Sequence, residues 1–439
     1  MPGVQEWRRK AISRKGRIIE SLFLAGFIAI AVGMLSLSAW GKTLYVSAGG
    51  SDGASGSIDR PWASLQFAVS RAGAGDEISV RGGTYGEGEI WIRGDHGQGG
   101  KEGNRLTIRA YPGETPLFVN GKRPFIIEAD HIRVEGLHFT NGKSIGIRGS
   151  GRRDIQIVKN HFSGKGYAWD AIGVTGTHIL VEGNVCDIQG NVVGTQGHCY
   201  YISHGSDIII RNNVARGPTG YGFHVFDQRR GEDPPGFERC IKDVILEGNT
   251  ASNSEQRAGI IVAAYDHARV ENVTIRNNVV YDNAAAGIFV PGIVKKVSIV
   301  HNTVYGNRGG VAVYLKSGRE YLEDVSVRNN ILDLSGTEKA RGPLYHVVNE
   351  NSNPTVILEG NLYWPGPARL LHASDKSPVT GNPLFRNAAG RDFRLKEGSA
   401  AIDRGIKSTD PGSDKDGTGR TQGNAPDLGA YEYAPASAR

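Results

Sequence analysis

Short hydrophobic segments that end in Asn recur along the middle of the chain. In each segment two β-branched or leucine side chains stand two residues apart, so both point to the same face of a strand. The segments end at Asn160, Asn184, Asn213, Asn249, Asn278, Asn302, Asn330 and Asn361. Successive Asn positions are 24, 29, 36, 29, 24, 28 and 31 residues apart. Self-similarity with a period in this range is typical of a solenoid, in which no repeat can bury its apolar side alone.

A turn is expected at each repeated Asn, which often follows Gly or another Asn. Asn tolerates the left-handed backbone conformation of a sharp bend, and its side chain can bond the backbone locally. Stacked in register, these side chains can also form an amide ladder along the solenoid.

A second apolar segment precedes the Asn-terminated one in each repeat. Two to three short strands per coil, with no helix between them, indicate a parallel β-helix. A leucine-rich-repeat solenoid would show Leu at fixed offsets, which this chain lacks. The chain's 62 glycines fit a fold with many tight turns. The second segments occupy residues 171–174, 199–202, 222–225, 259–262, 287–290 and 310–313.

The ends of the chain differ from the repeats. Residues 1–41 combine a basic start with an apolar run over 21–39, which predicts a cleaved signal peptide or a retained N-terminal membrane anchor. Residues 42–381 are assigned to the β-helix. Within them, residues 64–72 space apolar side chains as one helical face and are expected to cap the N-terminal end. The pattern changes again at residues 382–439, which are interpreted as a C-terminal capping segment.

The segments 43–47, 50–53, 61–66, 75–78 and 81–85, together with the repeats, resemble the right-handed parallel β-helix superfamily that contains pectate lyases. The resemblance covers nearly the whole chain after the leader. It implies an all-β, single-stranded right-handed parallel β-helix. It also implies activity on polysaccharides, and similar lyases often use Lys or Arg as the base together with calcium. Calcium is therefore the cofactor to test, and Lys165 is a candidate base.

Charge and cysteine content narrow the functional classes. The first 41 residues carry six basic and two acidic side chains, which account for +4 of the formal charge of +6. The remaining charge does not support a nucleic-acid partner. We expect a secreted, periplasmic or cell-surface monomer that meets a membrane only through its N-terminal segment. The three cysteines are too few for a disulfide framework and are expected to be buried apolar residues, with a Cys186–Cys199 bridge as the alternative.

Candidate chemistry follows from aligning the second strands by their inward apolar residues. The alignment stacks Ile172, Tyr200, Phe223, Ile260, Ile288 and Val311, and it places Tyr201 and His224 side by side on adjacent coils, facing outward about 5 Å apart. Asp170 and His198 begin the neighbouring strands. Titratable groups cluster in these three coils, next to the longest coil and its insertion over 227–239.

This constellation suits β-elimination in an acidic polysaccharide. A base removes the proton α to a uronate carboxylate, a cation or hydrogen-bond donor stabilises the enolate, and an acid assists the leaving oxygen. His198 or His224 is predicted as base and Tyr201 as acid. Arg229 and Arg230 are predicted to bind the carboxylate, while Lys165 and Trp169 contact the sugar.

Two alternatives stay open. The residues can be ordinary surface groups of a non-catalytic glycan-binding or matrix protein. A glycoside hydrolase needs only two suitably spaced carboxylates, for which Asp170 with Asp187 or Asp227 are candidates. A His-Glu-x-x-His metal motif, a Gly-x-Ser-x-Gly elbow, the paired-Asp motifs of polygalacturonase-like hydrolases and the Asp-Pro-His motif of alginate epimerases are missing from the sequence. The motif 414–417 resembles part of a calcium loop but is expected to be a solvated turn.

Overall fold

The computed structural model describes residues 41–119, 125–142, 144–149, 151–165, 170–188, 196–228, 239–266, 268–314, 322–337, 344–407, 412–420 and 422–434. The chain divides into two compact units, residues 1–42 and 43–439. The leader predicted for residues 1–41 therefore lies almost wholly outside the described residues. No described helix is long and apolar enough to cross a membrane.

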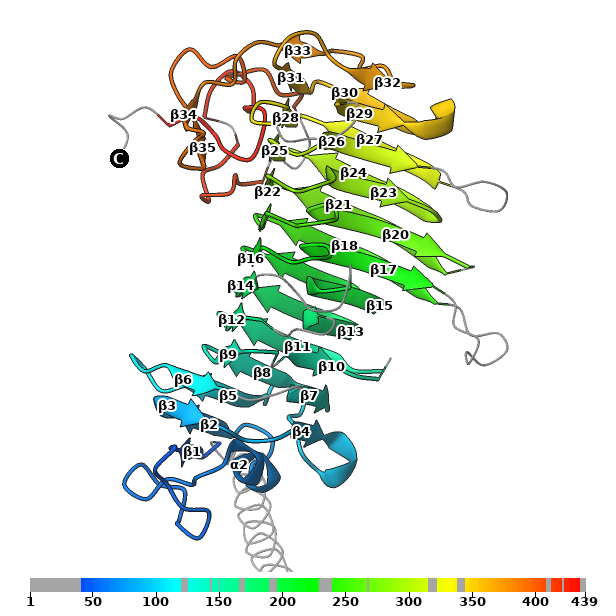
Figure 1. Ribbon diagram of the computed structural model, residues 1–439. Helices are drawn as coiled ribbons and strands as arrows, with labels where there is room; N and C mark the ends of the chain where they lie inside the picture. The colour runs from blue at the N-terminus through cyan, green and yellow to red at the C-terminus, as the bar shows by residue number, and fades with distance from the viewer. Residues whose placement is uncertain are drawn as a thin grey trace, which may run out of the picture. The chain divides into compact units, whose positions relative to one another are not determined.

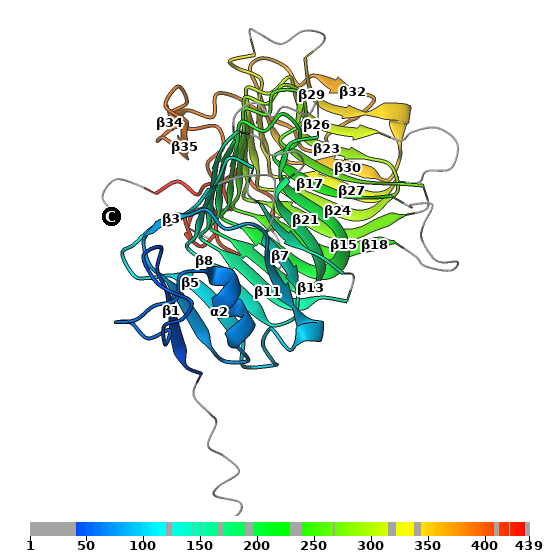
Figure 2. The same ribbon diagram turned by 60° about the horizontal axis from the view of Figure 1, so that its bottom comes forward.

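The second unit is a parallel β-helix whose coils each contribute strands to three faces (Figure 1). Within the described residues, faces 1 and 2 form one 21-stranded sheet and face 3 is a 12-stranded sheet. The inner strands of all three faces pair in parallel with the coils before and after them. Viewed closer to the helix axis, successive coils lie behind one another (Figure 2). The predicted all-β right-handed β-helix is confirmed.

Face 1 contains the second apolar segments predicted from the sequence. Its strands are β4 (Ile90–Arg93), β7 (Phe125–Glu128), β10 (Ile145–Ile147), the first halves of β13 (Asp170–Glu182) and β15 (His198–Arg211), β17 (Phe223–Gln228), β20 (Ile260–Tyr265), β23 (Ala286–Pro291), β26 (Gly309–Tyr314), β29 (Tyr345–Asn349) and β32 (Leu370–Leu371).

Face 2 contains the hydrophobic part of each Asn-terminated repeat. Its strands are β1 (Thr43–Val46), β2 (Glu77–Val80), β5 (Leu106–Ala110), β8 (Ile132–Glu135), β11 (Arg153–Val158), the second halves of β13 and β15, β18 (Cys240–Glu247), β21 (Arg269–Arg276), β24 (Val294–Val300), β27 (Leu322–Arg328) and β30 (Val356–Glu359).

Face 3 follows the repeated Asn. Its strands are β3 (Gly83–Tyr85), β6 (Pro116–Phe118), β9 (His138–Thr140), β12 (His161–Gly164), β14 (Val185–Ile188), β16 (Val214–Arg216), β19 (Thr250–Ser252), β22 (Val279–Tyr281), β25 (Thr303–Tyr305), β28 (Ile331–Asp333), β31 (Leu362–Trp364) and β33 (Val379–Thr380).

The repeated Asn residues form the expected amide ladder between faces 2 and 3. The Oδ1 of Asn249, for example, accepts from the backbone N–H of Asn213 at 2.9 Å and from its Nδ2 at 3.1 Å. The last ladder residue, Asn361, donates its Nδ2 to the carboxylate of Asp375 at 2.8 Å. Each ladder Asn is almost fully buried, so the ladder satisfies polar groups that water cannot reach.

One detail of the predicted turn is wrong. The left-handed conformation belongs to the residue before each ladder Asn, as at Asn212 with φ 56° and Gly248 with φ 64°. This explains why Gly or Asn so often precedes the repeated Asn, since both tolerate positive φ.

The N-terminal end carries the predicted helix, α2 (Leu65–Arg71), next to β1, β2 and β4 (Figure 1). Its buried face contains Leu65, Ala68 and Val69. Ser64 caps the helix by accepting from the Phe67 N–H at 3.2 Å, and the carboxylate of Glu87 accepts from the Leu65 N–H at 2.7 Å. Short 3-10 helices, η1 (Gly94–His96) and η2 (Glu350–Ser352), follow β4 and β29.

The tail lies along the flank of the later coils. The hairpin of β34 (Phe385–Asn387) and β35 (Asp392–Leu395) lies beside the later strands of face 3 (Figure 1). It places Phe385 and Phe393 in one cluster with Tyr281 and Tyr305 of face 3. Beyond it, the motif at 414–417 forms a turn, in which the Oδ1 of Asp414 accepts from two backbone N–H groups. The tail therefore packs against the later strands of face 3, β22 to β31.

Candidate active site

The register of face 1 matches the alignment made from the sequence. Tyr200 pairs with Phe223, and Tyr201 pairs with His224 on the next coil. Asp170 is the partner of His198, and Gly173 is the partner of Tyr201. The inward stack is Ile172, Tyr200, Phe223, Ile260, Ile288 and Val311, as predicted. Three coils thus bring an imidazole, a phenol and a carboxyl to one face.

Aromatic rings from these coils pack closely around His224. Its ring centroid lies 4.3 Å from that of His198, 4.9 Å from Tyr201, 4.7 Å from Tyr221 and 5.0 Å from Phe226. Such separations are typical of favourable aromatic contacts. We call these five side chains the aromatic cluster.

The predicted exposure of the imidazoles is wrong. His198 is only 5% exposed and His224 only 8%, because the rings of Tyr221 and Phe226 pack against them. Tyr201 keeps part of its surface open to solvent. Burial, with help from Arg257, lowers the pKa of His198 to about 4 and also lowers that of His224. Both imidazoles are therefore neutral at neutral pH.

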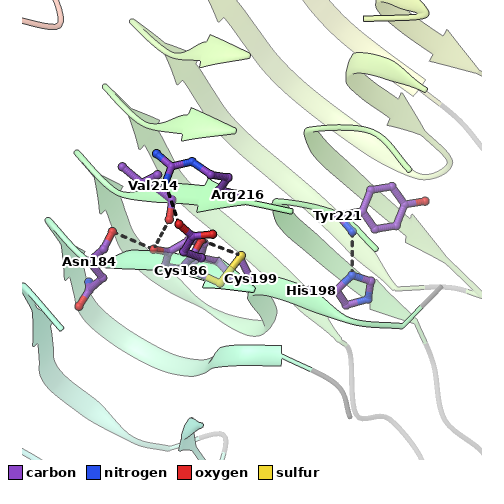
Figure 3. Close-up of a disulfide and its surroundings, with 9 residues drawn as sticks. Asn184, Cys186, His198, Cys199, Val214, Arg216 and Tyr221 are labelled. Atoms are coloured by element: carbon purple, nitrogen blue, oxygen red, sulfur yellow. Dashed lines mark hydrogen bonds and ion pairs between the residues drawn. A yellow bond between two sulfur atoms is a disulfide. The ribbon is translucent and has the colours of Figure 1, made fainter. Parts of the chain in front are cut away.

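The hydrogen bonding of His198 sets its tautomer. Its Nδ1 accepts from the backbone N–H of Tyr221 at 3.0 Å (Figure 3). In a neutral ring the proton then sits on Nε2. His198 can therefore offer a hydrogen-bond donor to a ligand, but it cannot easily serve as the base that the sequence suggested. The Nδ1 of His224 is buried and has no hydrogen-bond partner in the described structure.

Asp170 is better placed to move a proton. It begins β13, and burial raises the pKa of its carboxyl to about 6, against a smaller lowering effect of Arg148. A carboxyl with this pKa can exchange protons near neutral pH.

A floor without side chains lies next to this carboxyl. The Oδ2 of Asp170 lies 2.6 Å from the point where a Cβ on Gly173 would stand. On the preceding coil Gly146 pairs with Gly173, and a Cβ on Gly146 would meet nothing within 4 Å. The Asp170 carboxylate therefore covers Gly173, and the open backbone beside it, on which a sugar ring can lie, is that of Gly146.

One of the three predicted cations lies within the described residues. Lys165 is exposed at the end of the preceding face-3 strand. Trp169, Arg229 and Arg230 lie outside the described residues.

Sequence reasoning missed two residues of the site. Arg148 is exposed beside Asp170, and Arg257 lies 5.9 Å from the ring centroid of Tyr221. Both sit just outside the strands, where the two-residue alternation used for the alignment no longer applies. Arg257 stands three residues before the inward Ile260, so extending the alignment by one more position would have found it.

A disulfide joins Cys186 and Cys199 next to the cluster, with a Cα–Cα distance of 5.8 Å (Figure 3). The expectation of unpaired buried cysteines is therefore wrong for this pair, and Cys240 is the free thiol. The bridge ties β14 to the start of β15, so it fixes the strand that carries His198 and Tyr201.

The second carboxylate of a hydrolase is not placed beside Asp170. Asp187 lies on β14 of face 3, where it pairs with Arg216 at 2.7 Å. Asp227 is 3% exposed and pairs with His204 and Arg239 at 3.4 Å and 3.5 Å. Both are held by cations, which leaves Asp170 as the carboxyl of the described site.

The described residues do not fit a calcium ion here. No group of three or more His, Cys, Asp or Glu side chains that could hold a metal occurs in the described parts of the chain. Around Asp170 the neighbours are imidazole, phenol and glycine, whereas calcium takes six or more oxygen ligands. The chemistry proposed for this site therefore uses only side chains of the protein.

A separate hollow of about 490 Å³ lies on face 2. Its floor contains the aliphatic side chains Leu180, Ile209 and Ile245, and its rim contains His178 and Asp207. It shares no residue with the aromatic cluster.

A family model described as "Pel9A-like, right handed beta helix region" matches residues 44–330. The uncharacterized protein YwoF of Bacillus subtilis (strain 168) is 26% identical over 387 residues, which cover 79% of this chain and 80% of that protein. Pectate lyase PEL9 of Emericella nidulans is 40% identical over 82 residues, but these are only 18% of this chain and 19% of that enzyme.

Among solved structures, that of pectate lyase Pel9A is similar with a TM-score of 0.59 and 17% identity, over 90% of this chain and 96% of that one. Likeness at this level of identity concerns the fold. The comparisons agree with the three-faced β-helix.

Proposed function

Because the chain belongs to the Pel9A-like right-handed β-helix family, we propose that it is an exported lyase that cleaves an acidic polysaccharide by β-elimination. Asp170 would be the base and Tyr201 the acid. The basic and apolar leader supports export. The pectate lyases among its relatives support a uronate-containing substrate.

The single observation that carries the proposal is that Asp170 and Tyr201 both lie next to Gly173. Asp170 sits over the bare backbone of Gly173, and Tyr201 is the register partner of Gly173 on the next coil. A sugar ring laid over Gly146 against the Asp170 carboxylate, with its leaving oxygen toward Tyr201, would meet the two groups that proton removal and leaving-group protonation require.

The elimination balances with these two groups. The Asp170 carboxylate takes the proton α to the uronate carboxylate, and the electron pair forms the new carbon–carbon double bond. The bond to the glycosidic oxygen breaks, and that oxygen takes the proton of the Tyr201 hydroxyl. Arg148 and Arg257 would neutralise charge on the uronate and the enolate, and the His198 Nε2–H would add a hydrogen bond.

The test is the ultraviolet absorbance of unsaturated uronate during incubation with pectate, alginate and glycosaminoglycan panels, each with and without added calcium. We expect product from the parent chain, none from Asp170→Asn, and at least a hundredfold less from Tyr201→Phe, as for loss of general acid catalysis. Asp187→Asn, on face 3, should keep the parent rate. No absorbance change with any polymer would remove the lyase proposal.

One observation favours a second candidate, a non-catalytic glycan-binding protein. The two imidazoles are buried and neutral, and the acceptor nitrogen of His198 is already occupied by the Tyr221 N–H. This candidate predicts retention of uronate polymers without turnover, and unchanged retention for Asp170→Asn. Release of reducing ends without unsaturation would instead indicate hydrolysis.

A further inference from the structure

A second aromatic group lies on the outer surface of face 1, several coils beyond the aromatic cluster. Phe289, Tyr314 and Tyr345 are partly buried and pack over Ala312 and Val348, in a cluster separate from the main core. The rings of Phe289 and Tyr314 meet edge to face at 5.2 Å. We call these three aromatic side chains the distal platform.

A glycine beneath the platform lets one of its rings lie against the sheet. A Cβ on Gly309 would stand 2.3 Å from the ring of Tyr345, so that ring lies directly on the Gly309 backbone. Gly309 is also the register partner of Tyr345. The bare backbone at Gly309 lets the tyrosine lie down and present a ring to solvent, which is a surface suited to stacking against a sugar ring.

The platform continues the line of the candidate active site. Tyr201 pairs with His224, His224 with Ile261, and Ile261 with Phe289. Each coil step between paired strands is about 4.8 Å, so Phe289 lies about 14 Å from Tyr201 along the helix axis. That separation exceeds the length of a disaccharide, but a longer chain laid along the axis spans it.

A cation stands at the edge of the platform. Arg308 is exposed and immediately precedes β26. Burial raises the pKa of the Tyr345 hydroxyl, with help from Tyr314, while Arg308 lowers it, so the guanidinium is near that hydroxyl. The arrangement repeats that of Arg257 beside Tyr221 in the aromatic cluster. Aromatic surface with a cation at its edge fits a sugar that carries a carboxylate.

We infer that the Phe289, Tyr314 and Tyr345 platform, with Arg308, is a distal subsite that binds a uronate residue of the same polysaccharide chain that reaches the Asp170–Tyr201 site. The inference rests on the proposed function and extends it to substrate length. The protein binds along the helix axis and acts within long chains, and uronate disaccharides do not reach the platform.

The experiment measures binding of the full chain to pectate, alginate and chondroitin sulfate polymers by affinity electrophoresis and calorimetry, in an Asp170→Asn background that does not consume them. Phe289→Ala and Arg308→Gln should each weaken binding to the retained polymer about tenfold, because truncating a side chain that contributes to an interface costs more than about 1 kcal/mol. Phe289→Tyr should restore it. Binding of the uronate disaccharide should not change.

Control variants carry matched side chains far from face 1. Tyr111→Ala removes a half-buried ring and Arg60→Gln an exposed cation near the N-terminal end, and both should bind the polymer as the background does. Arg308 is exposed, so its variant reads out the subsite even if Phe289→Ala fails to fold. Unchanged binding by Phe289→Ala and Arg308→Gln overturns the distal subsite and leaves the proposed function standing. If none of the polymers retains the protein, both the distal subsite and the proposed function are overturned.

Discussion

Asp170 and His198 are register partners on adjacent coils, and their proton affinities are inverted relative to free side chains. Burial raises the pKa of Asp170 to about 6 and lowers that of His198 to about 4. The carboxylate is therefore the stronger base of the pair. Groups whose environments push their pKa values apart in this way often divide acid and base roles between them.

The pH dependence of activity should follow Asp170. If its carboxylate is the base, product formation rises from pH 5 to pH 7 with a midpoint near 6, the pKa of Asp170. The histidines give no further step in this range, because burial keeps the pKa of His198 at about 4. Initial rates of absorbance change, measured from pH 5 to pH 7, test this prediction. A rate that falls as the pH rises through 6 would assign Asp170 as the acid.

Stability should fall on acidification because of His224. Burial lowers its pKa below 6.5 in the folded chain, so the unfolded chain binds the proton first. The contribution of the neutral His224 side chain to the unfolding free energy is fully present above pH 6.5 and is lost as the pH falls. Between pH 7 and pH 5 the loss is about 2 kcal/mol for one such group. In denaturant titrations, the unfolding free energy of His224→Phe should therefore fall by about 2 kcal/mol less than that of the parent between pH 7 and pH 5. The exposed His178→Gln variant should behave as the parent does.

The disulfide should be detectable by thiol counting. The chain has three cysteines, so unfolding without reductant should expose one reactive thiol, that of Cys240, and unfolding with reductant should expose three. Cys186 and Cys199 are 13 residues apart. A loop of this size predicts that a Cys186→Ala, Cys199→Ala double variant loses about 3 kcal/mol of unfolding free energy. Three thiols without reductant would contradict the pairing.

The Asn ladder should be a main source of stability. Asn249→Ala removes the bonds from Asn213 to the Asn249 Oδ1 and leaves the Ile210 carbonyl without its 2.8 Å donor. Buried groups left without partners predict a loss of about 2–4 kcal/mol. Chemical denaturation measures it, with exposed Asn104→Ala as the control. Equal stability of the two variants would show that the ladder adds little.

Strand register could be predicted from the sequence because the inward apolar pairs leave one alignment of the coils. Ile172, Tyr200 and Phe223 stack as expected, and Tyr201 and His224 meet at 4.9 Å. Burial of the imidazoles could not be predicted, because it comes from rings such as that of Tyr221. This residue lies before the strand begins, where the inward–outward alternation of a strand does not say which way a side chain points. The flank position of the tail depends on contacts between segments far apart in sequence, which repeat spacing does not reveal.

The most direct measurement is a crystal structure of Asp170→Asn with a uronate tetrasaccharide cut from the polymer that the protein retains. We predict a sugar ring on the Gly146 backbone, with its glycosidic oxygen within hydrogen-bond distance of the Tyr201 hydroxyl and its carboxylate facing Arg148 or Arg257. Sugar bound only in the hollow over Ile209 on face 2, with the glycine floor free of sugar, would contradict the assignment of face 1 as the active surface.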